Sequence, residues 1–361
     1  MPSPDPVADT EWGVCWLEPG PMPAELAAEV RRLTGGIVPA WATHTASVPW
    51  VARATGLVTR KHVAYMPLDL FGLIALVVSQ DNSCRYCYGA TRTLLSVFGY
   101  SDEQIDRIAR DVHLSDLTRP EQVALEFARK VSHANPRATA FDRDALTRVG
   151  YSPPVIAEIA YMAAFQGFPN RIATFLALPS ERFFRIIGHP LARIVRPLIA
   201  RALRGKHAAP EATPAGAGPI AEIIAGLGDS PTARTVRTLV DDAFASPVLP
   251  RRTKLLMFAV IGRALGCDHS EDEARSSLAD DGLGAADVDE ILANLGSPKL
   301  DRRDALLVPF ARETVRYQTG PIQRRTRDLA RELPIEEVIE AVGIAALANS
   351  LARLSVLLET C

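Results

Sequence analysis

Two cysteines three positions apart, Cys84 and Cys87, are the residues best suited to chemistry in this sequence, within SQDNSCRYCYGATRTLL (79–95). Asp, Asn and Ser precede the first cysteine, and all three types cap helix N-termini. We therefore predict that both cysteines lie in the first turn of a helix and on one face. The positive end of the helix dipole favours a thiolate there. Such a pair can cycle between dithiol and disulfide, with one cysteine attacking and the other resolving.

The region that must position this pair occurs twice in the chain. Cys84 in SCRYC corresponds to Cys267 in GCDHS at an offset of 267 minus 84, or 183, and the triplet Phe-Ala-Arg recurs with the same offset. One residue is then lost, and Arg171 corresponds to Arg353 at an offset of 182. A register that stays constant from Cys84 to Ile156 and shifts by one residue before Arg171 indicates an internal duplication.

We divide the chain into four parts on this basis. Residues 1–39 are an N-terminal extension, and residues 40–185 are the unit that carries the CxxC pair. Residues 186–221 hold a basic helix and a linker, KHAAPEATPAGAGP, whose Ala, Pro and Gly content is typical of a flexible boundary. Residues 222–361 are a degenerate second unit, because Ser270 stands where Cys87 would correspond. We assign this second unit to packing or to forming a substrate pocket.

The periodicity of both units is helical. In PEQVALEFARKVS (120–132), apolar residues follow each other at four-residue intervals, as on one face of an amphipathic helix. Two capping boxes are expected to begin helices, Ser101 with Gln104 and Thr118 with Glu121. Alternating strand patterns are missing from the sequence. We predict an all-α fold of two helical bundle units arranged as an internal repeat.

Composition and charge narrow the class of protein. Of 361 residues, 48% are hydrophobic and 23% charged, which is the balance of a globular protein with room for two domains. Lys plus Arg number 40 and Asp plus Glu 42, so no nucleic-acid-binding charge is evident. The N-terminus has no signal-peptide pattern, and the longest apolar run, 70–78, is too short to span a bilayer. We predict a cytoplasmic protein that binds neither nucleic acid nor membranes.

The chain resembles the AhpD-like alkylhydroperoxidase and carboxymuconolactone decarboxylase superfamily in three motifs: LIALVVSQDNSCRYCYGATRTLL, LTRPEQVALEFARKV and PPVIAEIAYMAAFQGFPNRIATFLALP. The resemblance covers residues 60–180 and, more weakly, 250–358. It implies helical units that associate through helix faces, as a homo-oligomer or as a monomer that mimics a dimer. It also implies a thiol-dependent peroxidase or thiol-disulfide oxidoreductase without a cofactor. In that role Cys87 attacks the hydroperoxide, Cys84 resolves the product, and a thiol-carrying protein is the reductant.

Two residues of the redox members are replaced in this chain. Those members have a Glu twelve positions before the first cysteine and a His four after the second, where this chain has Gly72 and Thr91. Neither can act as a general base near neutral pH, so altered or weakened activity is expected. Asp69, one helical turn before Gly72, is our candidate for the missing base, although helix capping is the commoner role at such a position.

Three alternatives stay open at this point. Cys84, Cys87, Cys267 and His269 supply ligand types that zinc accepts, although the CxH spacing is poor for a metal. A non-redox, carboxymuconolactone decarboxylase-like enzyme would bind an apolar small molecule between helices. The residues expected to line that pocket are Tyr86, Tyr88, Phe165, Phe168 and Asn170. The third alternative is a non-catalytic oligomeric scaffold, in which the cysteines are inert.

Overall fold

The computed structural model describes residues 7, 11–58, 63–181 and 218–359. Within these ranges all regular secondary structure is helical, and no strand occurs in them. The predicted all-α fold class is therefore confirmed.

The first half of the chain contributes the helices around the thiol pair. In chain order they are α1 (Ala24–Thr34), α2 (Ala40–His44), α3 (Pro49–Leu57), α4 (Leu68–Asp81), α5 (Arg85–Phe98), α6 (Asp102–Arg110), the 3-10 turn η2 (Val112–Leu114), α7 (Arg119–His133), α8 (Ala140–Arg148), α9 (Pro153–Phe165) and α10 (Gly167–Phe175).

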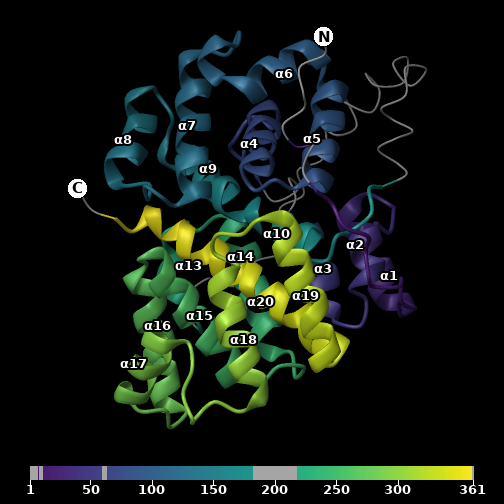
Figure 1. Ribbon diagram of the computed structural model, residues 1–361. Helices are drawn as coiled ribbons and strands as arrows, with labels where there is room; N and C mark the ends of the chain where they lie inside the picture. The colour runs from purple at the N-terminus through teal and green to yellow at the C-terminus, as the bar shows by residue number, and fades with distance from the viewer. Residues whose placement is uncertain (1–6, 8–10, 59–62, 182–217, 360–361) are drawn as a thin grey trace.

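The second half contributes a matching series. It comprises α13 (Ala221–Ala225), α14 (Pro231–Ala245), α15 (Arg251–Leu265), α16 (Asp268–Asp280), α17 (Ala285–Asn294), α18 (Arg302–Glu313), α19 (Thr319–Glu332), α20 (Ile335–Leu354) and the 3-10 turn η4 (Ser355–Leu357). Figure 1 shows α4 to α8 at one end of the molecule and α16 to α18 at the other, with α10 where the two groups meet.

The helix starts repeat with the offset found in the sequence. α4 begins at Leu68 and α15 at Arg251, which is 183 residues later. The same difference separates the starts of α5 and α16, of α6 and α17, and of α7 and α18. Cys84 and Cys267 each occupy the N-cap of their helix. The duplication is therefore one of helix order as well as of sequence.

Local sequence signals explain where these helices begin and end. Both predicted capping boxes are present, with Ser101 and Gln104 at α6 and with Thr118 and Glu121 at α7. Each box satisfies backbone N–H groups that the first helical turn leaves without partners. At the other end of α5, Gly99 has φ 105°. A left-handed residue stops a helix there, and glycine adopts it without steric cost.

The two halves differ where the sequence offset changes. In the described part of the chain, the two helices α9 and α10 of the first half correspond to the single helix α20 of the second. Pro169 lies near the start of α10 and has no N–H to continue the hydrogen-bond ladder. The proline therefore accounts for the break, since α20 contains no proline.

The helix α20 forms the centre of the molecule. It packs against α9 and α10 of the first half and against α15 of its own half. By length and apolar composition, Ile335–Leu357 could cross a membrane, but the 18-residue apolar stretch within it is entirely buried inside the protein. We interpret α20 as a core helix, because its apolar surface is already covered by protein.

Each half contains one buried glutamate, at equivalent positions of the repeat, that accepts hydrogen bonds from a neighbouring segment. Glu158 of α9 accepts hydrogen bonds from the backbone N–H groups of residues 64, 65 and 66 at 2.6, 2.8 and 2.6 Å. Glu340 of α20, 182 residues later, accepts from the backbone of Leu249 and from the indole of Trp50. Both carboxylates are fully buried, so these hydrogen bonds offset the cost of removing them from water.

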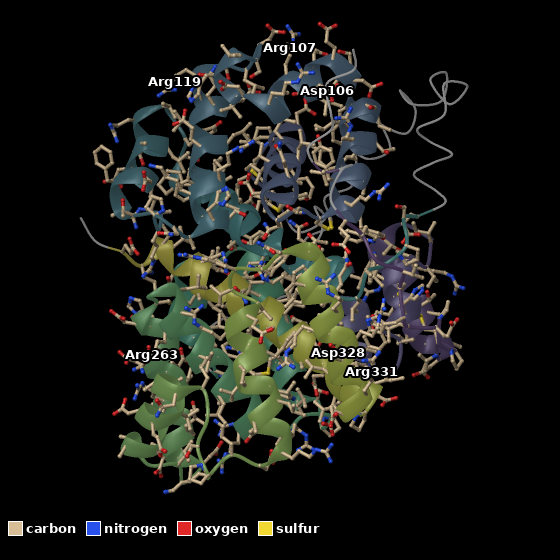
Figure 2. All side chains as sticks on the ribbon, in the orientation of Figure 1. Asp106, Arg107, Arg119, Arg263, Asp328 and Arg331 are labelled. Carbon is tan, nitrogen blue, oxygen red and sulfur yellow. The ribbon has the colours of Figure 1, made fainter. Side chains whose placement is uncertain are left out.

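The N-terminal extension is part of the folded body. α1 packs on α3, and the backbone N–H of Gly13 donates to Gln323 in α19 at 2.8 Å. Of the predicted basic helix and linker (186–221), residues 186–217 lie outside the described part of the chain. Figure 2 shows that Arg107 and Arg119 project from the outer end of the first half, and Arg263 and Arg331 from the sides of the second.

Candidate active site

The thiol pair lies at the N-terminus of α5, as predicted from the sequence. Cys84 is the N-cap residue, and the backbone N–H of Cys87 donates to its sulfur at 3.3 Å. Both cysteines are free thiols, with 0% of Cys84 and 6% of Cys87 exposed. The sulfur of Cys84 therefore occupies the position that a serine or aspartate oxygen takes in an ordinary N-cap.

The surroundings of the pair distinguish the two thiols. Burial raises the pKa of Cys84, but hydrogen bonds from the Cys87 thiol, from the N–H groups of Cys87 and Tyr86, and from the Thr174 hydroxyl outweigh it, so its pKa is lowered. Burial raises the pKa of Cys87 well above its ordinary value, and its hydrogen bond to Cys84 and the charge of Cys84 raise it further. These directions favour a thiolate at Cys84, the reverse of the order that the resemblance implies.

The aromatic residue between the two cysteines is fixed by a carboxylate. Tyr86 donates its hydroxyl hydrogen to Glu181 at 2.6 Å, and the same oxygen accepts the backbone N–H of Ala40 at 2.6 Å. Burial and the charge of Glu181 raise the pKa of Tyr86 well above its ordinary value, so the tyrosine stays a hydrogen-bond donor. This link joins the first turn of α5 to the start of α2.

The second half of the chain completes the surroundings of the thiols. Tyr317, in the loop before α19, donates its hydroxyl hydrogen to the backbone oxygen of Asn82 at 3.1 Å. The guanidinium of Arg171 lies over the Tyr317 ring at 5.6 Å, and Gln323 of α19 donates to the backbone oxygen of Thr174 at 2.8 Å. Residues of both halves therefore hold the loop that leads into Cys84.

A cavity of about 280 Å³ opens beside this loop. The first half contributes the end of α4, the loop that leads to Cys84 and the end of α7, and the second half contributes residues 315–317 and Arg353. Sequence reasoning did not identify this cavity. The available signal was the pair of repeat-related arginines, Arg171 and Arg353, which interrupt apolar helices and are both buried.

The structure places Asp69 away from the thiols. α4 and α5 are antiparallel neighbours: a Cβ at Gly72 would meet the Leu95 side chain at 2.9 Å, near the far end of α5. Asp69 lies at the start of α4, and its charge acts on Tyr100, which follows α5. Because α5 rises about 20 Å over its length, Asp69 is not within hydrogen-bond reach of either cysteine. The spacing of residues along α4 alone does not indicate that Asp69 and the cysteines lie at opposite ends of α5.

The other residues proposed from the sequence have structural roles. Tyr88, Phe165 and Phe168 are buried in the core, where Phe165 stacks on Tyr161 at 4.9 Å. Asn170 hydrogen-bonds to Ser79 and to the backbone oxygen of residue 78. These four side chains pack the helices of the first half and do not line the cavity beside Cys84.

Among the described residues of the second copy, Cys267 is an isolated thiol. Burial raises the pKa of Cys267, and the neighbouring His269 pairs with Glu222 at 3.2 Å. In the part of the chain that the structure describes, no three His, Cys, Asp or Glu side chains come together as a metal site. The zinc alternative therefore has no support among the described residues.

Comparison with known proteins gives a likeness at the level of structure. No family model matches the sequence, and no curated protein matches it either. The structure is similar to the AhpD core. That relative is an uncharacterized peroxidase-related protein from Ralstonia eutropha JMP134, 22% identical, with a TM-score of 0.42 over 48% of this chain and 95% of the other. An uncharacterized peroxidase-related protein from Silicibacter sp. TM1040 is 21% identical, with a TM-score of 0.40 over 51% of this chain and 96% of the other.

Proposed function

We propose that the protein is a thiol-disulfide oxidoreductase with alkylhydroperoxidase-like activity, in which Cys84 and Cys87 form the reactive pair. The observation that carries the proposal is the placement of Cys84 at the N-cap of α5, with the Cys87 N–H directed at its sulfur at 3.3 Å. A helix N-terminus stabilises a thiolate, and a second thiol three residues away can close a disulfide across the turn.

The proposed reaction has three steps. The Cys84 thiolate attacks the terminal hydroperoxide oxygen, so that the O–O bond breaks and Cys84 becomes a sulfenic acid, while the leaving alkoxide takes a proton from solvent and departs as an alcohol. The Cys87 thiol then displaces the hydroxyl as water and forms the Cys84–Cys87 disulfide. A dithiol donor, which we propose to be a thiol-carrying protein, restores both thiols by exchange and becomes a disulfide itself.

The missing proton acceptor limits the peroxidase step. Gly72 and Thr91 replace the Glu and His of the redox members, and Asp69 lies at the far end of α5. General-base assistance typically contributes about 10²- to 10⁴-fold to a rate, so peroxide turnover should be slower than in an efficient peroxidase by a factor of this order. Exchange with disulfides depends on the thiolate itself and is less affected.

The test is consumption of tert-butyl hydroperoxide with dithiothreitol as the donor. Cys84→Ser and Cys87→Ser should each abolish turnover, while Cys15→Ser, a matched change at a half-buried free cysteine, should leave it unchanged. Asp69→Asn should have no effect on the rate if the protein stays folded. Unchanged turnover in both active-pair variants would exclude the redox mechanism and favour the non-redox enzyme or the scaffold.

We propose that one chain acts as a pseudo-dimer. Tyr317 and Arg353 from the second half lie around the loop that leads to Cys84, which supports a single site completed within the chain. Association of further copies and a cytoplasmic location remain predictions. Light scattering of the purified chain measures the first, and a monomer that retains thiol exchange is the expected result.

A further inference from the structure

The cavity beside the loop that leads to Cys84 is lined by two arginines and one aspartate. The first half lines it with Asn82, Ser83 and Asn135, and the second half with Arg316, Tyr317 and Arg353. Polar groups from both halves therefore converge on one space of about 280 Å³. The space is large enough for water and for a small polar molecule.

Arg353 brings a buried positive charge to the wall of this cavity. Its guanidinium donates to the backbone oxygen of Ser132 at 3.0 Å, and to the backbone and side-chain oxygens of Asn349 at 2.9 and 2.7 Å. These acceptors are all neutral. Among the described residues, Arg353 forms no ion pair with a carboxylate. Buried charges in proteins are normally paired, so this charge lacks the usual compensation.

Two further guanidinium groups act on the same region. Arg316 is exposed, and Asn135 accepts from its two terminal nitrogens at 3.0 and 3.1 Å when the amide oxygen faces them. Arg171 is buried and donates to the backbone oxygens of Thr314 and Gly167 at 3.3 and 3.2 Å. Within the described ranges neither pairs with a carboxylate. Burial lowers the pKa of Arg353 well below its ordinary value, and the charges of Arg171 and Arg316 lower it further.

The carboxylate that lines the cavity does not neutralise these arginines. Asp81 is held by Arg129 at 3.1 Å and by His133 at 3.3 Å, both on α7. The carboxylate is therefore matched by partners of its own. The cluster of Arg171, Arg316 and Arg353 keeps an excess of positive charge next to a polar, open space.

We propose that this cavity binds the oxyanion of a small molecule, a carboxylate or a phosphate, between Arg316 and Arg353. An anion there would compensate the buried charge of Arg353 and relieve its repulsion by Arg171 and Arg316. The hydroxyl of Ser83 supplies a further hydrogen-bond donor at the wall, whereas the Asn82 amide already donates to the backbone oxygen of Val78 and to the Ser132 hydroxyl. Ser83, at the wall of the cavity, directly precedes Cys84, so a hydroperoxide that also carries such an oxyanion is the expected substrate class; this part rests on the proposed function.

The binding test uses the full chain with Cys84→Ser and Cys87→Ser, so that thiol chemistry does not contribute. Calorimetric titration with inorganic phosphate and, separately, with succinate should give saturable binding of one ion per chain in at least one arm. Binding of phosphate alone indicates a phosphate ester as ligand, and binding of succinate alone indicates a carboxylic acid. Added KCl should weaken binding, because the contact is partly exposed to solvent.

Arg316→Gln is the decisive variant, since an exposed side chain can be changed without disturbing the core. Loss of its charge-assisted hydrogen bond should weaken binding about tenfold or more. Arg312→Gln, the same change at an exposed arginine four residues earlier, should leave affinity unchanged. Arg353→Lys should also weaken binding, and circular dichroism will show whether that variant is folded.

Absence of saturable binding in both arms would overturn the proposal, as would equal affinities of the Arg316→Gln and Arg312→Gln variants. Peroxide turnover by the chain with both cysteines intact is measured separately. Anion binding without turnover would retain the site and reject the proposed function. Turnover without anion binding would retain the function and reject the site.

Discussion

The buried ion pair in the second half gives a stability prediction with a defined magnitude. Lys254 of α15 and Glu340 of α20 are both fully buried, with Nζ and Oε1 3.3 Å apart. Lys254 also donates to the backbone oxygens of Ala243 and Ser246, each at 2.6 Å. Replacing Lys254 by Met removes the positive charge and all three contacts, and leaves the Glu340 carboxylate buried without its cation.

The expected cost follows from this geometry. Removing one partner of a buried ion pair typically destabilises a protein by about 3–5 kcal/mol, because the remaining charge is uncompensated. For a chain of 361 residues, that corresponds to a fall in thermal midpoint of about 4–7 °C. The indole of Trp50 still donates to Glu340 at 2.9 Å, so the lower half of this range is the closer expectation.

Thermal and urea unfolding, followed by circular dichroism, measure the effect. Lys299→Met is the matched control: its side chain is 55% exposed and pairs with Asp287 at 2.7 Å, so its loss should cost less than about 1 kcal/mol. The double change Lys254→Met with Glu340→Gln should recover part of the loss, because no unpaired charge remains. Equal midpoints for Lys254→Met and Lys299→Met would refute the reasoning.

Three further predictions concern the site. The first compares alkylation by iodoacetamide of Cys87→Ser, which keeps the Cys84 thiol, with that of Cys84→Ser, which keeps the Cys87 thiol. Cys87→Ser should react from a lower pH, because the pKa of Cys84 is lowered and that of Cys87 is raised. The opposite order would identify Cys87 as the thiolate. The hydrogen bond to Asp81 raises the pKa of His133, so its contribution to stability is present below about pH 6.5 and is lost as pH rises through the raised pKa. His133→Gln should flatten the unfolding midpoint over that range, and an NMR titration with an ordinary or lower pKa would contradict this. Tyr317→Phe should lower stability by about 1 kcal/mol through loss of its hydrogen bond to the loop before α5, measured by urea unfolding, and an unchanged midpoint would show that this bond contributes little.

Features set by neighbours along the chain were predictable from the sequence. The capping boxes at Ser101 and Thr118 depend on residues three positions apart, and both are present. The N-terminal position of Cys84 in α5 follows from the same kind of local signal. The constant offset of the duplication also anticipated the helix order of the second half, since equivalent sequences begin helices at equivalent residues.

Features that depend on packing between helices were not predictable in this way. Asp69 was placed near the cysteines by its distance from Gly72 along one helix, but the antiparallel arrangement of α4 and α5 puts it at the opposite end. Tyr317 lies near Cys84 only because the second half folds against the first. No spacing within a single unit carries information about such a contact.

The central position of α20 has a consequence for how the molecule unfolds. Its buried residues belong to the same hydrophobic cluster as those of α9, α10 and α15, so one contiguous core extends through both copies of the duplicated sequence. Two copies that share a core cannot melt independently, because loss of either exposes the apolar face of the other. The cooperative unit is therefore the whole tandem, and calorimetry should record one heat-absorption peak whose calorimetric and van't Hoff enthalpies agree.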